Sequence, residues 1–150
     1  MLHFNNFQKS YYSNPIIQID DLKLKKGIYW IKGINGYGKS TLLKSIGGIL
    51  DFKSDIILNQ KISIKKHPVA FRSLVNFAEA EPNFPEFLTG LEMVKLFESA
   101  KKGTKIQSEQ LIALFKMQDY IDDRVGTYSS GMLKKLSLVM AFLGNPDLIL

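Results

Sequence analysis

A short glycine-containing segment, flanked by apolar residues on both sides, constrains the fold of this chain more than any other feature. It carries the pattern GxxxxGK followed by Ser or Thr, and its residues are Gly33, Ile34, Asn35, Gly36, Tyr37, Gly38, Lys39, Ser40 and Thr41. An aromatic and β-branched run, 28–31, precedes it, and apolar residues at helical spacing, 42–50, follow it. This order predicts a buried strand, a phosphate-binding loop and a helix within an α/β fold.

Each residue type in this loop has a chemical reason to bind a triphosphate. The three glycines allow the backbone to bend so that several N–H groups converge on phosphate oxygens. The helix that starts near Lys39 directs unsatisfied N–H groups and its positive dipole end at the same phosphates. Lys39 is predicted to reach the β- and γ-phosphates, Ser40 to bind Mg²⁺ and Thr41 to donate near the α-phosphate. The expected ligands are a nucleoside triphosphate and Mg²⁺.

Composition narrows the class of protein. At 150 residues and 45% hydrophobic, the chain can bury one sizeable core. The formal net charge is +6, but the lysines are spread in short clusters, which favours a solvated surface over a nucleic-acid interface. No apolar run approaches the ~20 residues that a membrane span needs, and the lack of cysteine agrees with a reducing compartment. We therefore expect a cytoplasmic globular protein without a nucleic-acid partner.

Short apolar runs separated by turn residues predict further strands. Residues 16–19 indicate an early strand, and residues 56–64 indicate a hairpin that turns at 59–60. A small antiparallel sheet is therefore expected beside the nucleotide-binding strand. Residues 74–78 and 148–150 indicate two more strands.

Capping residues predict the positions of three further helices. Thr89 and Glu92 fit a capping box, and Ser108 is the expected cap of a second helix. A third helix is expected after Gly131, and Gly-Asn-Pro at 144–146 is expected to stop it.

A second motif precedes the last helix and gives the chain its resemblance to a family. It consists of Tyr128, Ser129, Ser130, Gly131 and Met132. Together with the phosphate-binding loop, this order resembles the ATP-binding cassette (ABC) ATPases, over essentially the whole chain from Leu2 to Leu150. By itself the motif is also an ordinary helix cap.

The resemblance implies an α/β P-loop NTPase fold with an antiparallel β subdomain and a helical subdomain. The core with the P-loop would comprise about 1–82 and 128–150, and the helical subdomain about 83–127. The family's acidic residues after the strand at 148–150, including the catalytic base, would fall beyond Leu150, so the resemblance implies that the C-terminal part is missing. No catalytic base is assigned in this chain, which we expect to be inactive or nearly so in ATP hydrolysis.

The resemblance also implies partners. Ser129 and Gly131 would contact ATP bound to a second ABC subunit in a head-to-tail dimer. An integral membrane permease would hold the pair at the inner face of the cell membrane, and the form of the second motif is similar to that of some bacterial exporters. A soluble ABC ATPase acting on ribosomes or DNA and a binding-only truncated cassette remain as alternatives.

Other family positions are less sharply defined in this sequence. Tyr11 or Tyr12 would stack on adenine. Ala80 stands where the family usually has a Gln that joins Mg²⁺ to the membrane partner, and the flanking Glu79 or Glu81 is a candidate metal ligand or a solvated loop charge.

Overall fold

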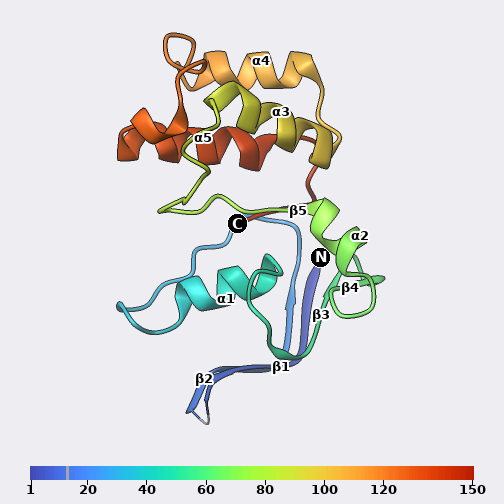
Figure 1. Cartoon of the computed structure of the whole chain (residues 1–150). Helices are drawn as coiled ribbons and strands as arrows, with labels where there is room; N and C mark the ends of the chain where they lie inside the picture. Colours follow the sequence, from blue (N-terminus) through green and yellow to red (C-terminus); the bar gives the residue numbers. More distant parts are fainter. Residues whose placement is uncertain (13) are drawn as a thin grey trace. The chain divides into compact units, whose positions relative to one another are not determined.

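The computed structural model describes residues 1–12 and 14–150. The chain divides into two compact units, Met1–Arg72 and Ser73–Leu150, which are described separately (Figure 1).

The first unit contains an antiparallel sheet of order β2-β1-β3-β4. Its strands are β1 (Leu2–Tyr11), β2 (Asn14–Leu24), β3 (Lys53–Leu58) and β4 (Ile62–Ser63). Phe4, Phe7 and Ile56 are completely buried beneath it, and the two phenylalanine rings meet edge to face at 5.7 Å. The predicted early strand and hairpin are confirmed, and the hairpin turns at Asn59 and Gln60 with φ of 53° and 61°. β1 was not among the predicted strands.

A bulge interrupts the pairing of β1 with β2. Lys9 pairs with Ile17 and Ser10 with Pro15, so Ile16 is an extra residue on β2. Proline has no N–H to donate to a ladder, which explains why the register shifts at Pro15. Because a bulge breaks the alternation of side chains, Ile16 and Ile17 both lie against Gly38.

The helix that follows the glycine-rich loop is α1 (Lys39–Ile46). It is shorter than the predicted 42–50 stripe, because Gly47 caps its C-terminus and Gly48 adopts a φ of 71°. Ser45 and Ile46 are buried, whereas Ile49 is exposed.

The prediction of a buried strand at Ile28–Ile31 is wrong for the structure described. The segment belongs to no strand ladder within residues 1–12 and 14–150, and its side chains are exposed, Trp30 by 84%. A strand is stabilised by hydrogen bonds to a neighbour, so β propensity without such a partner leaves the segment irregular.

The helix α2 (Pro68–Leu74) spans the boundary between the two units. It was not predicted, although Pro68 stands at its first position, where the missing N–H costs no hydrogen bond. The predicted strand at 74–78 is consequently reduced to β5 (Val75–Asn76), which pairs in parallel with β6 (Leu148–Ile149).

The rest of the second unit is helical. The elements α3 (Gly90–Lys101), α4 (Lys105–Leu114) and α5 (Ser130–Phe142) pack around a shared apolar cluster, with the short 3₁₀ turn η1 (Val125–Thr127) before α5. Val94, Leu136 and Val139 are completely buried in that cluster. The division into core and helical subdomains at 82 and 128 stays a prediction.

The capping residues explain where these helices begin and end. The Thr89–Glu92 capping box is confirmed. Ser108 is not a cap: it lies buried inside α4, and Thr104 caps that helix by accepting from the N–H of Gln107. The predicted stop after α5 is confirmed, with Gly144 at a φ of 77°.

Candidate functional site

The glycine-rich loop turns into α1 through two residues with left-handed backbone. Gly36 and Gly38 have φ of 87° and 79°, and Gly38 is the residue that precedes the helix. Gly33 has no positive φ, so of the three glycines expected to supply backbone freedom only these two use it. The first N–H groups of α1 have no intrahelical acceptor, so they are available to an anion at this end of the helix.

Lys39 folds its side chain back over the loop. Its Nζ donates to the carbonyl oxygens of Gly33 at 2.7 Å and Ile34 at 2.8 Å. These two contacts hold the ammonium group at the mouth of the loop, beside the N-terminus of α1. A positive charge and a helix N-terminus then act together on any anion that enters.

A pocket of about 390 Å³ lies against this loop. It is lined by Tyr11, Ile16, Asn35, Gly36, Gly38, Lys39, Ser40 and Thr41. Ser40 and Thr41, the expected metal ligand and α-phosphate donor, thus face the same space as Lys39. Ile34 and Tyr37 are exposed and do not line the pocket.

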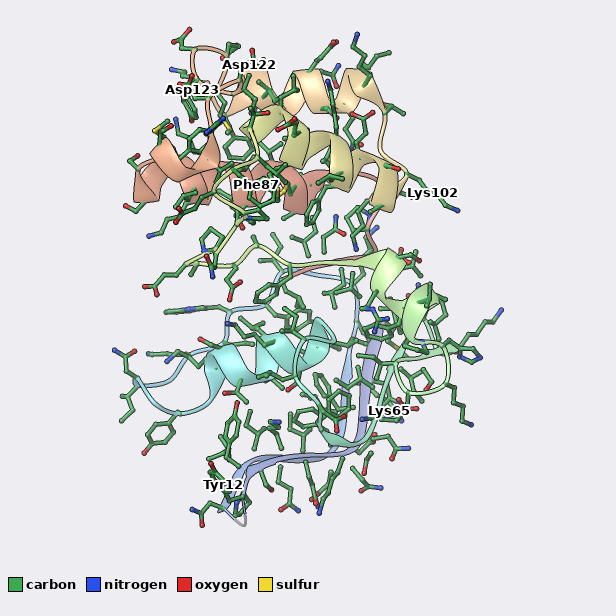
Figure 2. The ribbon with its side chains drawn as sticks, in the orientation of Figure 1. Tyr12, Lys65, Phe87, Lys102, Asp122 and Asp123 are labelled. Atoms are coloured by element: carbon green, nitrogen blue, oxygen red, sulfur yellow. The ribbon has the colours of Figure 1, made fainter. Side chains whose placement is uncertain are left out.

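The structure distinguishes the two tyrosines that were candidates for stacking on adenine. Tyr11 lines the pocket and is 43% exposed. Tyr12 is fully exposed beyond the end of β1, with a φ of 54°, and does not line it (Figure 2). An aromatic ring beside a phosphate-binding loop can stack on a planar base.

Sequence reasoning missed Ile16 as a residue of this pocket. A Cβ on Gly38 would lie 3.0 Å from its Cγ2, which shows how closely the bulge brings β2 to the loop. Pro15 was the signal that could have found it, since a proline inside a strand indicates a bulge or an edge.

The second motif forms the N-terminus of α5. Ser129 is the N-cap, and its Oγ accepts from the N–H of Met132 at 3.3 Å. Ser130 and Gly131 are exposed in the first turn. The predicted anion-facing positions therefore lie at a helix N-terminus, where the dipole favours negative charge.

Tyr128, in contrast, points into the core. Its hydroxyl donates to the carbonyl oxygen of Tyr120 at 2.7 Å, and the two rings meet edge to face at 5.3 Å. Burial, followed by the influence of Tyr120 and Asp123, raises the pKa of Tyr128 to about 12. Its side chain has a packing role rather than the ligand contact expected for the motif.

The candidate metal ligands of the second unit are not gathered into a site. Glu79 is half-buried and its backbone carbonyl accepts from the hydroxyl of Ser137, whereas Glu81 is exposed. Among the described residues, no three His, Asp or Glu side chains are grouped so as to hold a metal ion.

A glycine-rich loop at a helix N-terminus, with a lysine at its mouth and a hydroxyl pair in the same pocket, defines a phosphate-binding protein of the P-loop class. A family model described as ABC transporter matches residues 18–150. The chain therefore belongs to this family, as an ABC nucleotide-binding domain with the α/β P-loop fold.

Known proteins agree with this assignment. The uncharacterized ABC transporter ATP-binding protein YdbJ of Bacillus subtilis is 31% identical over 157 residues, covering 100% of this chain and 49% of that protein. YhcH of the same organism, described in the same words, is 27% identical over 153 residues, covering 100% and 50%. The cytochrome c biogenesis ATP-binding export protein CcmA of Legionella pneumophila is 28% identical over 149 residues, covering 99% and 74%. This chain spans about half the length of YdbJ and YhcH.

Solved structures show the same fold. The ATP-binding subunit of an ABC transporter superposes with a TM-score of 0.83 at 24% identity, covering 99% of this chain and 64% of that one. The ATP-binding cassette MJ0796, a dimer bound to ADP and Pi, superposes with a TM-score of 0.82 at 20% identity, covering 99% and 72%. Within residues 1–12 and 14–150, no helix is both long and apolar enough to cross a bilayer.

Proposed function

We propose that this chain binds Mg·ATP as the nucleotide-binding part of an ABC transporter. The observation that carries the proposal is the Lys39 ammonium, which lies over a loop with two left-handed glycines and beside Ser40 and Thr41 in one pocket. These residues would bind the phosphates, Ser40 would hold Mg²⁺, and Tyr11 would stack on adenine.

In the complete protein, ATP hydrolysis drives transport by a membrane permease. Ser129 and Gly131 at the start of α5 would face the ATP of a second ABC subunit, because a helix N-terminus with a serine cap suits a phosphate. Export is the direction that we favour, in agreement with the name of the CcmA relative. The protein would then lie in the cytoplasm, held at the inner face of the membrane by its permease.

The chain by itself is expected to bind nucleotide and hardly to hydrolyse it. Phosphoryl transfer requires a positioned water and stabilisation of the developing charge, and this chain supplies no assigned base for that water. A metal-binding role of Glu79 or Glu81 belongs to the same proposal. Robust Mg²⁺-dependent phosphate release by the purified chain would contradict it.

Calorimetric titration with Mg·ATP tests the binding proposal. Lys39→Ala should weaken binding at least about tenfold, because it removes the charge at the loop mouth. The matched control is Lys26→Ala, which deletes an exposed lysine outside the pocket and should leave the affinity unchanged. Equal affinity of the Lys39→Ala variant and the unchanged chain, with both folded by circular dichroism, would overturn the proposal.

A further inference from the structure

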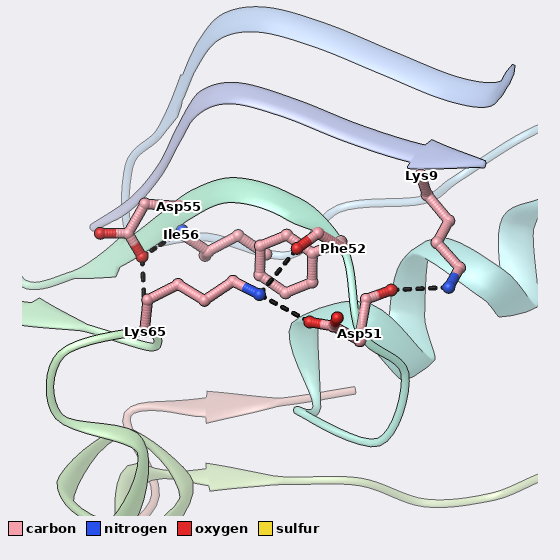
Figure 3. Close-up of polar contacts among 6 residues, drawn as sticks. All are labelled: Lys9, Asp51, Phe52, Asp55, Ile56 and Lys65. Atoms are coloured by element: carbon pink, nitrogen blue, oxygen red, sulfur yellow. Dashed lines mark hydrogen bonds and ion pairs between the residues drawn. The ribbon is translucent and has the colours of Figure 1, made fainter.

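Lys9 links the end of β1, which lies near it in the sequence, to the loop after α1, which is distant in the sequence. It lies on β1 at the bulge, two residues before Tyr11. Its Nζ donates to the backbone carbonyl of Asp51 at 2.6 Å, in the loop that follows α1 (Figure 3). The same ammonium lies 4.8 Å from the centroid of the Tyr11 ring.

Asp51, the acceptor of the Lys9 hydrogen bond, is held in place by further contacts. The carboxylate of Asp51 accepts from Nζ of Lys65 at 2.6 Å, and Lys65 also donates to the carbonyl of Phe52 at 2.7 Å (Figure 3). The Lys65 hydrogen bond, followed by that of the Phe52 backbone, lowers the pKa of the Asp51 carboxyl. Phe52 is itself buried against Phe7 of β1. The acceptor of Lys9 is therefore anchored to the hydrophobic core.

A cation over an aromatic ring occupies one face of that ring. Attraction to the ring quadrupole holds the cation and the ring together, and the opposite face remains for a planar group. Tyr11 lines the pocket of the glycine-rich loop. An immobilised ring has less side-chain entropy to lose when a base stacks on it than a mobile one.

We propose that Lys9 is a positioning residue for the nucleotide base: it fixes Tyr11 between the Asp51 carbonyl anchor and the pocket, so that one face of the ring meets the base. This inference rests on the proposed function, because it takes Tyr11 as the ring that stacks on adenine. Lys9 does not touch the nucleotide in this arrangement, and its effect reaches only the base and not the phosphates.

The test separates base recognition from phosphate binding. Mg·ATP and inorganic tripolyphosphate are titrated into the unchanged chain and into Lys9→Met, Lys9→Arg and Lys53→Met, the last removing an exposed lysine of β3. Lys9→Met should weaken ATP binding about three- to tenfold, the range expected for a cation–π contact that orders a stacking ring. The affinity of Lys9→Met for tripolyphosphate should equal that of Lys53→Met. Lys9→Arg should restore the ATP affinity of the unchanged chain.

Each other result has a defined meaning. Equal ATP affinity of Lys9→Met and the unchanged chain would overturn the positioning role and leave the proposed function intact. Parallel weakening of ATP and tripolyphosphate beyond the Lys53→Met control would also overturn it, since the effect would then be electrostatic or structural. Failure of the unchanged chain to bind ATP would overturn the proposed function and this inference with it.

Discussion

The hydroxyl of Tyr128 donates to the backbone carbonyl of Tyr120 at 2.7 Å. This bond places Tyr128, the first residue of the second motif, in the core of the second unit. The motif thus combines two tasks: its tyrosine holds the preceding loop, and its serine and glycine residues form the exposed helix N-terminus.

Tyr128→Phe removes the donor and should lower the free energy of unfolding by about 1–3 kcal/mol, because the Tyr120 carbonyl is left without its partner. The difference in the free energy of unfolding between the unchanged chain and Tyr128→Phe should depend on pH. Since folding raises the pKa of Tyr128 to about 12, the unfolded chain loses this proton first, from about pH 10. The stability of the unchanged chain should therefore fall more steeply than that of the variant between pH 10 and 12. Parallel urea-denaturation curves over that range would contradict the role of the buried hydroxyl.

Two glycines of the second unit should respond oppositely to alanine. A Cβ on Gly90 would overlap the Tyr128 hydroxyl, whereas a Cβ on Gly131 would meet only the Ser129 Oγ at 3.9 Å. Gly90→Ala should cost at least about 2 kcal/mol. Gly131→Ala should leave stability unchanged or raise it by up to about 1 kcal/mol, because alanine favours the helix. Thermal denaturation of both variants measures these effects. Equal destabilisation of the two would contradict the explanation that a Cβ on Gly90 overlaps the Tyr128 hydroxyl.

Asn76 joins β5 to the end of α5. Its buried side-chain amide donates to the carbonyl oxygens of Ala141 and Leu143, each at 2.9 Å. Asn76→Asp removes both donors and buries a carboxylate, so it should cost about 3 kcal/mol or more. Asn83→Asp makes the same chemical change at an exposed position and should be nearly neutral. A small effect at Asn76 in chemical denaturation would show that the two carbonyls do not depend on it.

The fluorescence of Trp30 tests whether the segment 28–31, which has no strand partner among the described residues, is exposed to solvent. Trp30 is the single tryptophan of the chain and is 84% exposed. Its fluorescence should therefore have the long-wavelength maximum of a solvated indole and be quenched efficiently by acrylamide. A short-wavelength maximum that is independent of protein concentration would show instead that the segment is buried within the chain.

Most of the nucleotide pocket and several element boundaries were predictable from local signals. The glycine-rich loop, the Thr89 capping box and the Gly144 stop each depend on a few adjacent residues, so spacing alone indicates them. The cap of α4 was missed: Thr104, and not Ser108, precedes the first residue of the helix and accepts from the N–H of Gln107.

Other misses depended on partners that are distant in the sequence or on how segments pack. Residues 28–31 have the composition of a strand, but composition does not supply a ladder neighbour. Tyr11 is the last residue of β1, whereas Tyr12 follows the strand with a left-handed backbone, so the end of the strand separates the two tyrosines. The connection of Lys9 to Asp51 spans 42 positions. The burial of the Tyr128 side chain could not be predicted, because it depends on how the loop before α5 packs.

The bulge at Pro15 also makes three positions interdependent over evolutionary time. Ile16 and Ile17 both abut Gly38, so a larger residue at any one of these positions should require the other two to shift. We therefore expect a larger side chain at position 16, 17 or 38 to be tolerated only with a smaller one at another of these positions. Functional homologues in which residue 16 is enlarged should accordingly carry a smaller residue at 17, and a side chain at 38 should be the rarest substitution of the three.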